Sequence, residues 1–454
     1  MAPSEMLSLR PQLDLAGEAE IPRRRLADGP LDASAAYQLV HDELLLDGNA
    51  RLNLATFVTT WMEPEATRLI AECLDKNLVD KDEYPQSAEL ERRCVDILAD
   101  LWGAPPADRA TGTSTTGSSE ACMLAGLALL HRWRAARPDG GEGRRPNLVM
   151  GANVQVCWEK FCRYWDVEAR QVPVGGGATH LTAEGATARC DEDTIGVVAI
   201  LGSTFDGTYE PVAAIAEALD DLGRERGIDV PIHVDAASGG FVAPFLDPEL
   251  AWDFRVARVQ SINSSGHKYG LVFPGVGWIV WRDAAALPRE LIFEVAYLGG
   301  SMPTFGLNFS RPAAQVIAQY FMLIRLGREG YRRVQQECRD VAVWLAGRID
   351  EIKDFALVSG GDELPVLAFR TAGEDVGWSV YDVSERLRGH GWIVPAYPMP
   401  DGMEDVHVLR VVVRNGFSRD LAELFLRDLR AVLHALERPG AAAIVPGDRT
   451  GFHH

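Results

Sequence analysis

From residue 147 to residue 281 the sequence alternates between short apolar segments and longer stretches with helical periodicity. The apolar segments are rich in β-branched residues and are bounded by Gly, Pro, Asp or Ser, as buried strands are. They are NLVMGA (147–152), TIGVVAILGST (194–204), VPIHVDAAS (230–238), RVQSINSS (258–265) and GVGWIVW (275–281). Residues 212–227 carry apolar side chains at three- and four-residue spacing. We therefore predict an α/β fold in which helices cover both faces of a mostly parallel sheet.

The pattern changes after about residue 335. Strand-like segments at 355–371, 392–398 and 406–414 interleave there with helical stretches at 378–389 and 418–437. A chain of 454 residues is too long for one core. The domains that we predict are an irregular arm with one helix (1–50), a large domain (51–335), a small C-terminal α+β domain (336–440) and a flexible tail (441–454).

The formal net charge of −20 argues against a nucleic acid or an anionic membrane surface as a partner. The seven cysteines form no CxxC pair, so we interpret them as reduced thiols rather than as a disulfide frame or a zinc site. The N-terminus lacks the apolar stretch of a signal peptide, and no run approaches the roughly 20 apolar residues of a membrane span. We expect a soluble cytoplasmic protein with no integral membrane association.

Polar residues follow three of the predicted strand and turn segments, where open α/β sheets bind ligands. Ser118 is the expected N-cap of a helix, with Ser119 in its first turn, and the pair suits a phosphate or serves only as a cap. Asp235 ends a buried strand and needs a positive partner, which is either a structural one or a protonated ring nitrogen on a ligand. The spacing of His233 and Asp235 could also suit a metal, but no third ligand is near in sequence.

Lys268, in the segment SINSSGHKYG, is one of only five lysines in the chain. Burial would lower its pKa, and a neutral amine can attack an aldehyde. A phosphate site, a carboxylate for a pyridinium nitrogen and a reactive lysine are the three anchors of pyridoxal 5′-phosphate. Together, and in this order along an α/β pattern, they predict that cofactor.

Over nearly its whole length the chain resembles the bacterial glutamate decarboxylases, pyridoxal-phosphate enzymes of the group II decarboxylase family. The lysine motif alone indicates only the wider superfamily. The segments that indicate glutamate decarboxylase are NLATF (53–57), DEYPQSA (82–88) and LGGSMPTFGLNFSRP (298–312). The resemblance implies a large domain of the fold type I class, like other pyridoxal-phosphate-dependent transferases, with a seven-stranded sheet.

The resemblance also implies the cofactor contacts. Lys268 would bind the cofactor covalently, and Asp235 would pair with its pyridinium nitrogen. The other implied contacts are Ser118 and Ser119 at the phosphate, His267 close by, Ser310 from a neighbouring subunit, Gln155 over the ring, Ala237 beneath it and Thr204 near the cofactor hydroxyl. The implied catalytic residues are Lys268, Asp235, Gln155 and Thr204, and no metal is implied.

For the substrate, the resemblance implies that Arg410 binds the α-carboxylate, so that the site closes between the two domains. The residues that would line the pocket for the distal carboxylate are Thr56, Phe57, Asn77 and Asp80. The implied reaction converts L-glutamate to 4-aminobutanoate and CO2 and consumes one proton. One alternative to glutamate decarboxylation is the decarboxylation of another amino acid. A lyase or transaminase reaction is a less favoured alternative.

Family members are homo-oligomers, dimers at least and often hexamers, with shared active sites. The C-terminal segment lacks a basic amphipathic stretch with tryptophan, so no calmodulin binding is expected. Asp80 near a second carboxylate would favour activity at acidic pH, unless it is only a salt-bridge partner. His454 aligns with a histidine that regulates acid-responsive members, which suggests a role in acid resistance; a loose or appended tail is the alternative. Asp206 stands where relatives commonly have an uncharged residue.

Overall fold

The computed structural model describes residues 24–26, 29–104, 106, 110–295, 302–373 and 376–437. The chain divides into two compact units, residues 1–52 and residues 53–454. In the first unit α1 (Ala33–Leu44) begins after Asp32, whose carboxylate accepts hydrogen bonds from the backbone N–H groups of Ser34 and Ala35. The N-terminal 23 residues and the tail from 438 onward, which includes His454, lie outside the described residues.

The second unit contains a seven-stranded sheet with the order β1-β7-β6-β5-β4-β2-β3. Its strands are β1 (Thr111–Thr115), β2 (Asn147–Gly151), β3 (Glu168–Val172), β4 (Thr194–Ile200), β5 (Ile232–Asp235), β6 (Val259–Ser264) and β7 (Gly277–Trp281). Only β7 runs antiparallel to its neighbours β1 and β6. The predicted mostly parallel sheet of seven strands is confirmed, although β1 and β3 were not among the segments predicted as strands.

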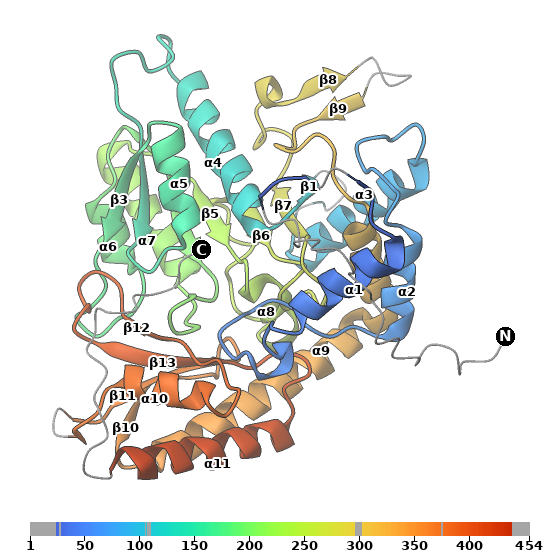
Figure 1. The fold of residues 1–454 in the computed structure, drawn as a ribbon. Coiled ribbons are helices and arrows are strands. Elements are labelled where there is room, and N and C mark those ends of the chain that lie inside the picture. The colour runs from blue at the N-terminus through green and yellow to red at the C-terminus, as the bar shows by residue number, and fades with distance from the viewer. Residues whose placement is uncertain are drawn as a thin grey trace. The chain divides into compact units, whose positions relative to one another are not determined.

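Helices cover both faces of this sheet (Figure 1). On one face, α4 (Ser118–Ala135) and α5 (Val156–Tyr164) pack on alternate strand residues such as Leu148, Val198 and Ile279. The opposite face packs in one core with α3 (Pro85–Leu101), α7 (Val212–Arg226) and the first half of α9 (Ala314–Asp350). The shorter helices of this core are α2 (Pro64–Glu72), α6 (Ala183–Ala188) and α8 (Ala243–Leu246). Two covered faces explain why the central strands are apolar throughout.

A second, antiparallel sheet has the order β10-β11-β13-β12. Its strands are β10 (Phe355–Gly360), β11 (Val366–Thr371), β12 (Ala396–Pro398) and β13 (His407–Val412). α10 (Val380–Arg388) packs on β12 and β13, and α11 (Arg419–Leu436) packs on α9 and α10. On α11 the buried residues include Phe425, Leu429, Val432 and Leu436, which form one apolar stripe. α9 runs across the predicted domain boundary at residue 335 and has its non-helical break earlier, at Gly327. The boundary therefore stays a prediction. A short hairpin is formed by β8 (Phe293–Val295) and β9 (Met302–Thr304).

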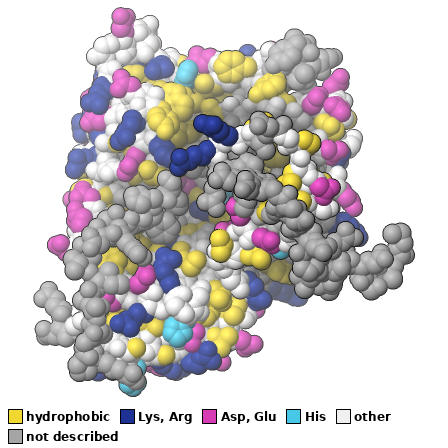
Figure 2. Space-filling view, viewed as in Figure 1, with side chains coloured by type: hydrophobic (Ala, Val, Ile, Leu, Met, Phe, Trp, Pro, Cys, Tyr) yellow, Lys and Arg dark blue, Asp and Glu magenta, His cyan; other side chains and the backbone are white. Residues whose placement is uncertain are grey.

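None of the described helices is long and apolar enough to cross a bilayer. On the face drawn in Figure 2, basic and acidic side chains are interspersed. This face therefore offers no broad field of one charge to a nucleic acid.

Candidate active site

The predicted site residues follow strands that end at the same edge of the large sheet. β4, β5 and β6 are parallel neighbours, so the segments that leave their carboxyl ends lie together. β5 ends at Asp235, β6 leads into the turn that carries Lys268, and β4 leads into a loop that contains Thr204. This edge is where open α/β sheets place their ligand sites.

The Asp235 carboxylate is buried among neutral donors. One oxygen, Oδ2, accepts a hydrogen bond from the Trp158 indole (2.9 Å) and lies 3.6 Å from the Cys122 thiol. The other, Oδ1, accepts from the Asn263 amide (3.0 Å) and from the backbone N–H of Ala237 (3.2 Å). Within the described part of the chain, no cationic side chain forms an ion pair with this carboxylate. The buried charge is thus oriented by the protein and left without a positive partner, which favours the ligand hypothesis over a structural one.

Asn263 connects Asp235 to a buried histidine. Its carbonyl oxygen lies 2.7 Å from Nε2 of His233, and Nδ1 of that ring lies 2.7 Å from the Ser261 hydroxyl. Burial lowers the pKa of His233 to about 4. The ring is therefore neutral above that pH, and the His233–Asp235 pair serves as part of a hydrogen-bond chain rather than as two metal ligands.

Lys268 is half-buried, and its amine has little around it to compensate its charge. Its Nζ donates to the Ser238 hydroxyl (3.2 Å) and lies 5.2 Å from the centroid of the Phe57 ring. Burial lowers the pKa of Lys268, and the nearby Asp235 carboxylate opposes that shift. Leu271, three residues later, has a φ of 65°, which is strained for a branched residue and is typical of functional turns. A lysine made less basic by burial is suited to act as a nucleophile.

The first turn of α4 lies beside the lysine turn. Gly117, not Ser118, occupies the N-cap position, and the Ser118 hydroxyl lies 2.7 Å from the Ser265 hydroxyl. The prediction of Ser118 as the N-cap was therefore wrong, because its hydroxyl bonds across to the turn after β6 instead. Ser119 is exposed in the first turn. A helix start without a side-chain cap, with two hydroxyls beside it, keeps donors available for a phosphate.

The His267 ring lies against this helix start, since a Cβ added to Gly117 would come within 2.9 Å of its Cε1 atom. The backbone N–H groups of Gly275 and Val276 point at its Nδ1 (3.4 and 3.3 Å), which places the proton of the neutral ring on Nε2. Burial, and to a smaller extent the Lys268 charge, lowers the pKa of His267 to about 4. His267 is therefore a neutral donor beside the predicted phosphate position.

Arg410 on β13 reaches the same site from the second sheet. Its Nη1 donates to the Thr204 carbonyl and its Nη2 to the Ala55 carbonyl, while its buried Nε has no hydrogen-bond partner among the described residues. The guanidinium carbon lies 4.8 Å from the Phe57 centroid, so one aromatic ring contacts both Arg410 and Lys268. A buried cation that meets only carbonyls and ring faces is suited to bind a carboxylate.

The remaining predicted residues divide between this site and a second place. Gln155 precedes α5 and accepts from the backbone N–H of Cys157 (2.6 Å), so it caps that helix. Thr56 adjoins Phe57, and its carbonyl accepts from Arg414. Asn77, however, donates its side-chain amide to the Ser310 hydroxyl (3.3 Å). Its side-chain oxygen accepts from the backbone N–H of Arg311, the residue after Ser310 (3.2 Å).

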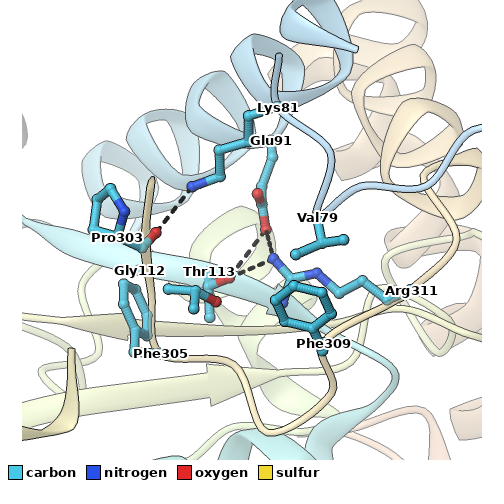
Figure 3. A pocket seen from close by; sticks show the side chains of 10 residues that line it. Val79, Lys81, Glu91, Gly112, Thr113, Pro303, Phe305, Phe309 and Arg311 are labelled. Carbon is cyan, nitrogen blue, oxygen red and sulfur yellow. Dashed lines mark hydrogen bonds and ion pairs between the residues drawn. The ribbon is translucent and has the colours of Figure 1, made fainter. Parts of the chain in front are cut away.

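Asn77, Asp80 and Ser310 thus belong to a separate group, and none of the contacts between described residues joins it to Lys268 or Arg410. Figure 3 shows the pocket beside this group, where Arg311 meets Glu91 and Thr113 while Lys81 reaches the Pro303 carbonyl. At about 70 Å³ this pocket is too small for a cofactor. Asp80 has no ion pair within the described part of the chain, so its salt-bridge alternative gains no support.

Several site residues were missed from the sequence. They are Cys122, Trp158, Ser238, Asn263 and Ser265. The pairing of β5 with β6 places Asn263 opposite Asp235, so a strand register would have identified it. Cys122, Cys157 and Asp235 form the one group in the described ranges that could hold a metal ion. Because Oδ2 of Asp235 already accepts from Trp158, the arrangement is better explained as an oriented carboxylate.

Comparisons with known proteins all match this chain to decarboxylases. Residues 29–372 match the model of the pyridoxal-dependent decarboxylase conserved domain. Glutamate decarboxylase of Aliivibrio fischeri is 51% identical over 441 residues, covering 96% of this chain and 94% of that protein. Glutamate decarboxylase beta of Listeria monocytogenes is 48% identical, covering 93% and 92%. The solved structure of Lactobacillus brevis glutamate decarboxylase superposes with a TM-score of 0.90 at 47% identity, covering 94% and 97%.

Proposed function

The chain belongs to the pyridoxal-dependent decarboxylase family, and from that premise we propose that it decarboxylates L-glutamate to 4-aminobutanoate and CO2. The observation that carries this proposal is the shared contact of Lys268 and Arg410 with Phe57. It brings a buried amine and a buried guanidinium to one ring, as a reaction at an amino-acid α-carbon requires.

The site fits pyridoxal 5′-phosphate by the chemistry of its donors. Asp235, oriented by four neutral donors, would hold the pyridine nitrogen in its protonated form, and Lys268 would hold the aldehyde carbon. The phosphate would lie at the start of α4, near Ser118, Ser119 and His267, and the other proposed contacts are Gln155, Thr204, Ala237 and Ser310. When bound, the cofactor accepts the electron pair that remains on the substrate after CO2 leaves.

Arg410 would bind the α-carboxylate of the substrate and fix which bond at the α-carbon is broken. Its unpartnered Nε and its two Nη groups give a planar donor set that matches a carboxylate, which a lysine could not provide. Phe57 covers the guanidinium and excludes water from the ion pair. One proton is taken up at the α-carbon for each CO2 released.

The distal carboxylate would be bound by Thr56, Phe57, Asn77 and Asp80. The separation of Asn77, Asp80 and Ser310 from the Lys268 group supports a homo-oligomer, a dimer at least, in which one chain completes the site of another. Asp80 beside the substrate carboxylate would require one proton between the two groups, so activity should favour acidic pH. The seven described cysteines are free and buried, which fits our proposal of a cytoplasmic location.

An absorbance titration tests the function. Purified protein with bound cofactor should change its absorbance on addition of glutamate and release CO2 and 4-aminobutanoate in equal amounts. Lys268→Ala should abolish turnover, because the covalent anchor is lost, while Lys353→Ala on the surface should leave it unchanged. Release of CO2 from another amino acid but not from glutamate would contradict the substrate, and a keto acid product without CO2 would contradict the reaction.

A further inference from the structure

Asp206 is a buried acid that the proposed reaction does not use. Its carboxylate is 1% exposed and lies in the loop between β4 and α7. Oδ1 accepts from the backbone N–H (3.2 Å) and the hydroxyl (2.6 Å) of Thr208, and Oδ2 accepts from the hydroxyl of Thr179. Across the described ranges it forms no ion pair. Burial of a carboxylate costs free energy unless hydrogen bonds compensate for it. We therefore infer that these three hydrogen bonds stabilise the conformation of this loop.

The same loop contacts the second sheet through its carbonyl groups. The Thr204 carbonyl accepts from Arg410, and the Phe205 carbonyl accepts from the Tyr397 hydroxyl. The Phe205 and Tyr397 rings also pack edge to face at 5.8 Å. Thr204 and Phe205, which immediately precede Asp206, therefore bind one side chain each from the second sheet. These side chains are Arg410 on β13 and Tyr397 on β12.

Arg410 depends on this loop for its orientation. One Nη group is fixed by Thr204, the other by Ala55, and the guanidinium lies 5.6 Å from the Tyr397 centroid. A shift of the Thr204 carbonyl would rotate the guanidinium and move the unpartnered Nε. Small misplacements of a carboxylate-binding group weaken substrate binding strongly.

We propose that Asp206 is a positioning residue for Arg410: it fixes the loop whose carbonyls orient the substrate-binding guanidinium, and so sets the affinity for the substrate α-carboxylate. This inference rests on the proposed function of Arg410. The Asp206 carboxylate acts in two directions, within the loop through Thr208 and outward to the segment before α6 through Thr179. It therefore joins the loop before α7 to the segment before α6.

Three variants separate the charge of Asp206 from its bonds. Asp206→Asn keeps an acceptor for Thr208, and the Thr179 hydroxyl can rotate to accept from the new amide, so KM for glutamate should rise by less than about threefold. Asp206→Ala removes all three bonds and should raise KM about tenfold with kcat changed less than about threefold. Thr179→Val removes only the outward bond and should raise KM by about threefold.

The double variant Asp206→Ala with Thr179→Val should have the KM of Asp206→Ala alone, because both changes remove the same bond. Asp221→Ala, an exposed acid on α7, is the matched control and should have the wild-type KM. The affinity for glutarate as a non-reacting dicarboxylate provides a second measurement without turnover. It should weaken in Asp206→Ala about as much as KM rises, because one carboxylate of glutarate takes the place of the substrate α-carboxylate at Arg410, and an unchanged affinity would overturn the proposal.

Equal loss of kcat and of bound cofactor in Asp206→Ala and Thr179→Val, without a selective rise in KM, would indicate a merely structural role and overturn the proposal. An unchanged KM in both would also overturn it. If Asp206→Ala does not fold, Thr179→Val and Asp206→Asn still decide the question. A wild-type protein that does not turn over glutamate would contradict the proposed function instead, so the two failures are distinguishable.

Discussion

At the scale of single residues, the site combines a reactive amine with imidazoles held in their neutral form. His267 has a pKa of about 4 in the folded protein, below the ordinary value of 6.5. Between these values the unfolded chain binds a proton that the folded protein does not. His267 therefore reduces the free energy of unfolding as the pH falls from about 6.5 to about 4. His233 acts in the same direction over the same range.

This gives a prediction for His267→Gln in the cofactor-free protein. The variant should lose less stability than the wild type between pH 7 and pH 4.5, by on the order of 2 kcal/mol, in denaturant unfolding followed by tryptophan fluorescence. Parallel profiles for His267→Gln and the wild type would show that the ring is not buried in its neutral form.

Residue types alone were enough to propose Lys268, Asp235 and the Ser118–Ser119 pair as cofactor contacts. They could be predicted because charged groups are rare in buried places and because hydroxyls at a helix start suit a phosphate. Asn263 and Trp158 could not, since an amide or an indole near a strand is ordinary until the partner strand or helix is known. The same holds for Asp206, whose partner Thr179 is 27 residues away in the chain.

At the scale of elements, β7 and α4 approach each other closely at the end of the site where we propose that the phosphate binds. A Cβ added to Gly277 would lie 2.6 Å from the carbonyl carbon of Gly117 and 2.8 Å from the Ser118 nitrogen. We expect Gly277→Ala to displace the start of α4, lower the unfolding temperature by several degrees and weaken cofactor binding at least tenfold. Calorimetry and cofactor release on dialysis measure the two effects.

Gly347 in α9 offers the matched control for that substitution. Nothing lies within 4 Å of a Cβ added there, so Gly347→Ala should leave cofactor binding unchanged and stabilise the helix by about 0.5–1 kcal/mol. If Gly277→Ala retained its cofactor as the wild type does, the first turn of α4 would not form the phosphate site.

The strands that the sequence pattern missed are the two edges of the sheet. β1 (TGTST) and β3 (EARQV) each have one neighbouring strand and are partly exposed. Edge strands need no continuous apolar run, so a pattern that recognises buried strands overlooks them. The central strands, covered on both faces, were predicted correctly for the same reason.

At the scale of the whole molecule, one chain leaves its predicted substrate residues in two places. Phe57 and Arg410 lie with Lys268, whereas Asn77 lies with Ser310. The resemblance gave Phe57 and Asn77 as parts of one pocket without saying which chain supplies each, and it implied a neighbouring subunit only for Ser310. On α1 in the first unit, Tyr37, Val40 and Leu44 are all more than half exposed, which also fits a chain that associates with copies of itself.

Subunit mixing tests this arrangement. Lys268→Ala and Asn77→Ala should each be nearly inactive alone. If each site combines Lys268 of one chain with Asn77 of another, a mixed dimer contains one site with both wild-type residues. An equimolar mixture that is unfolded, refolded and reloaded with cofactor should then recover about a quarter of the wild-type activity, since half of the dimers are mixed and each has one intact site.

The control pair for this experiment is Lys268→Ala with Arg410→Ala. Both residues contact Phe57 in the same chain, so one site of each mixed dimer would lack Lys268 and the other would lack Arg410. No site would then be intact, and no activity should return on mixing. Recovery with the Arg410 pair but not with the Asn77 pair would reverse the assignment of the two groups to their chains.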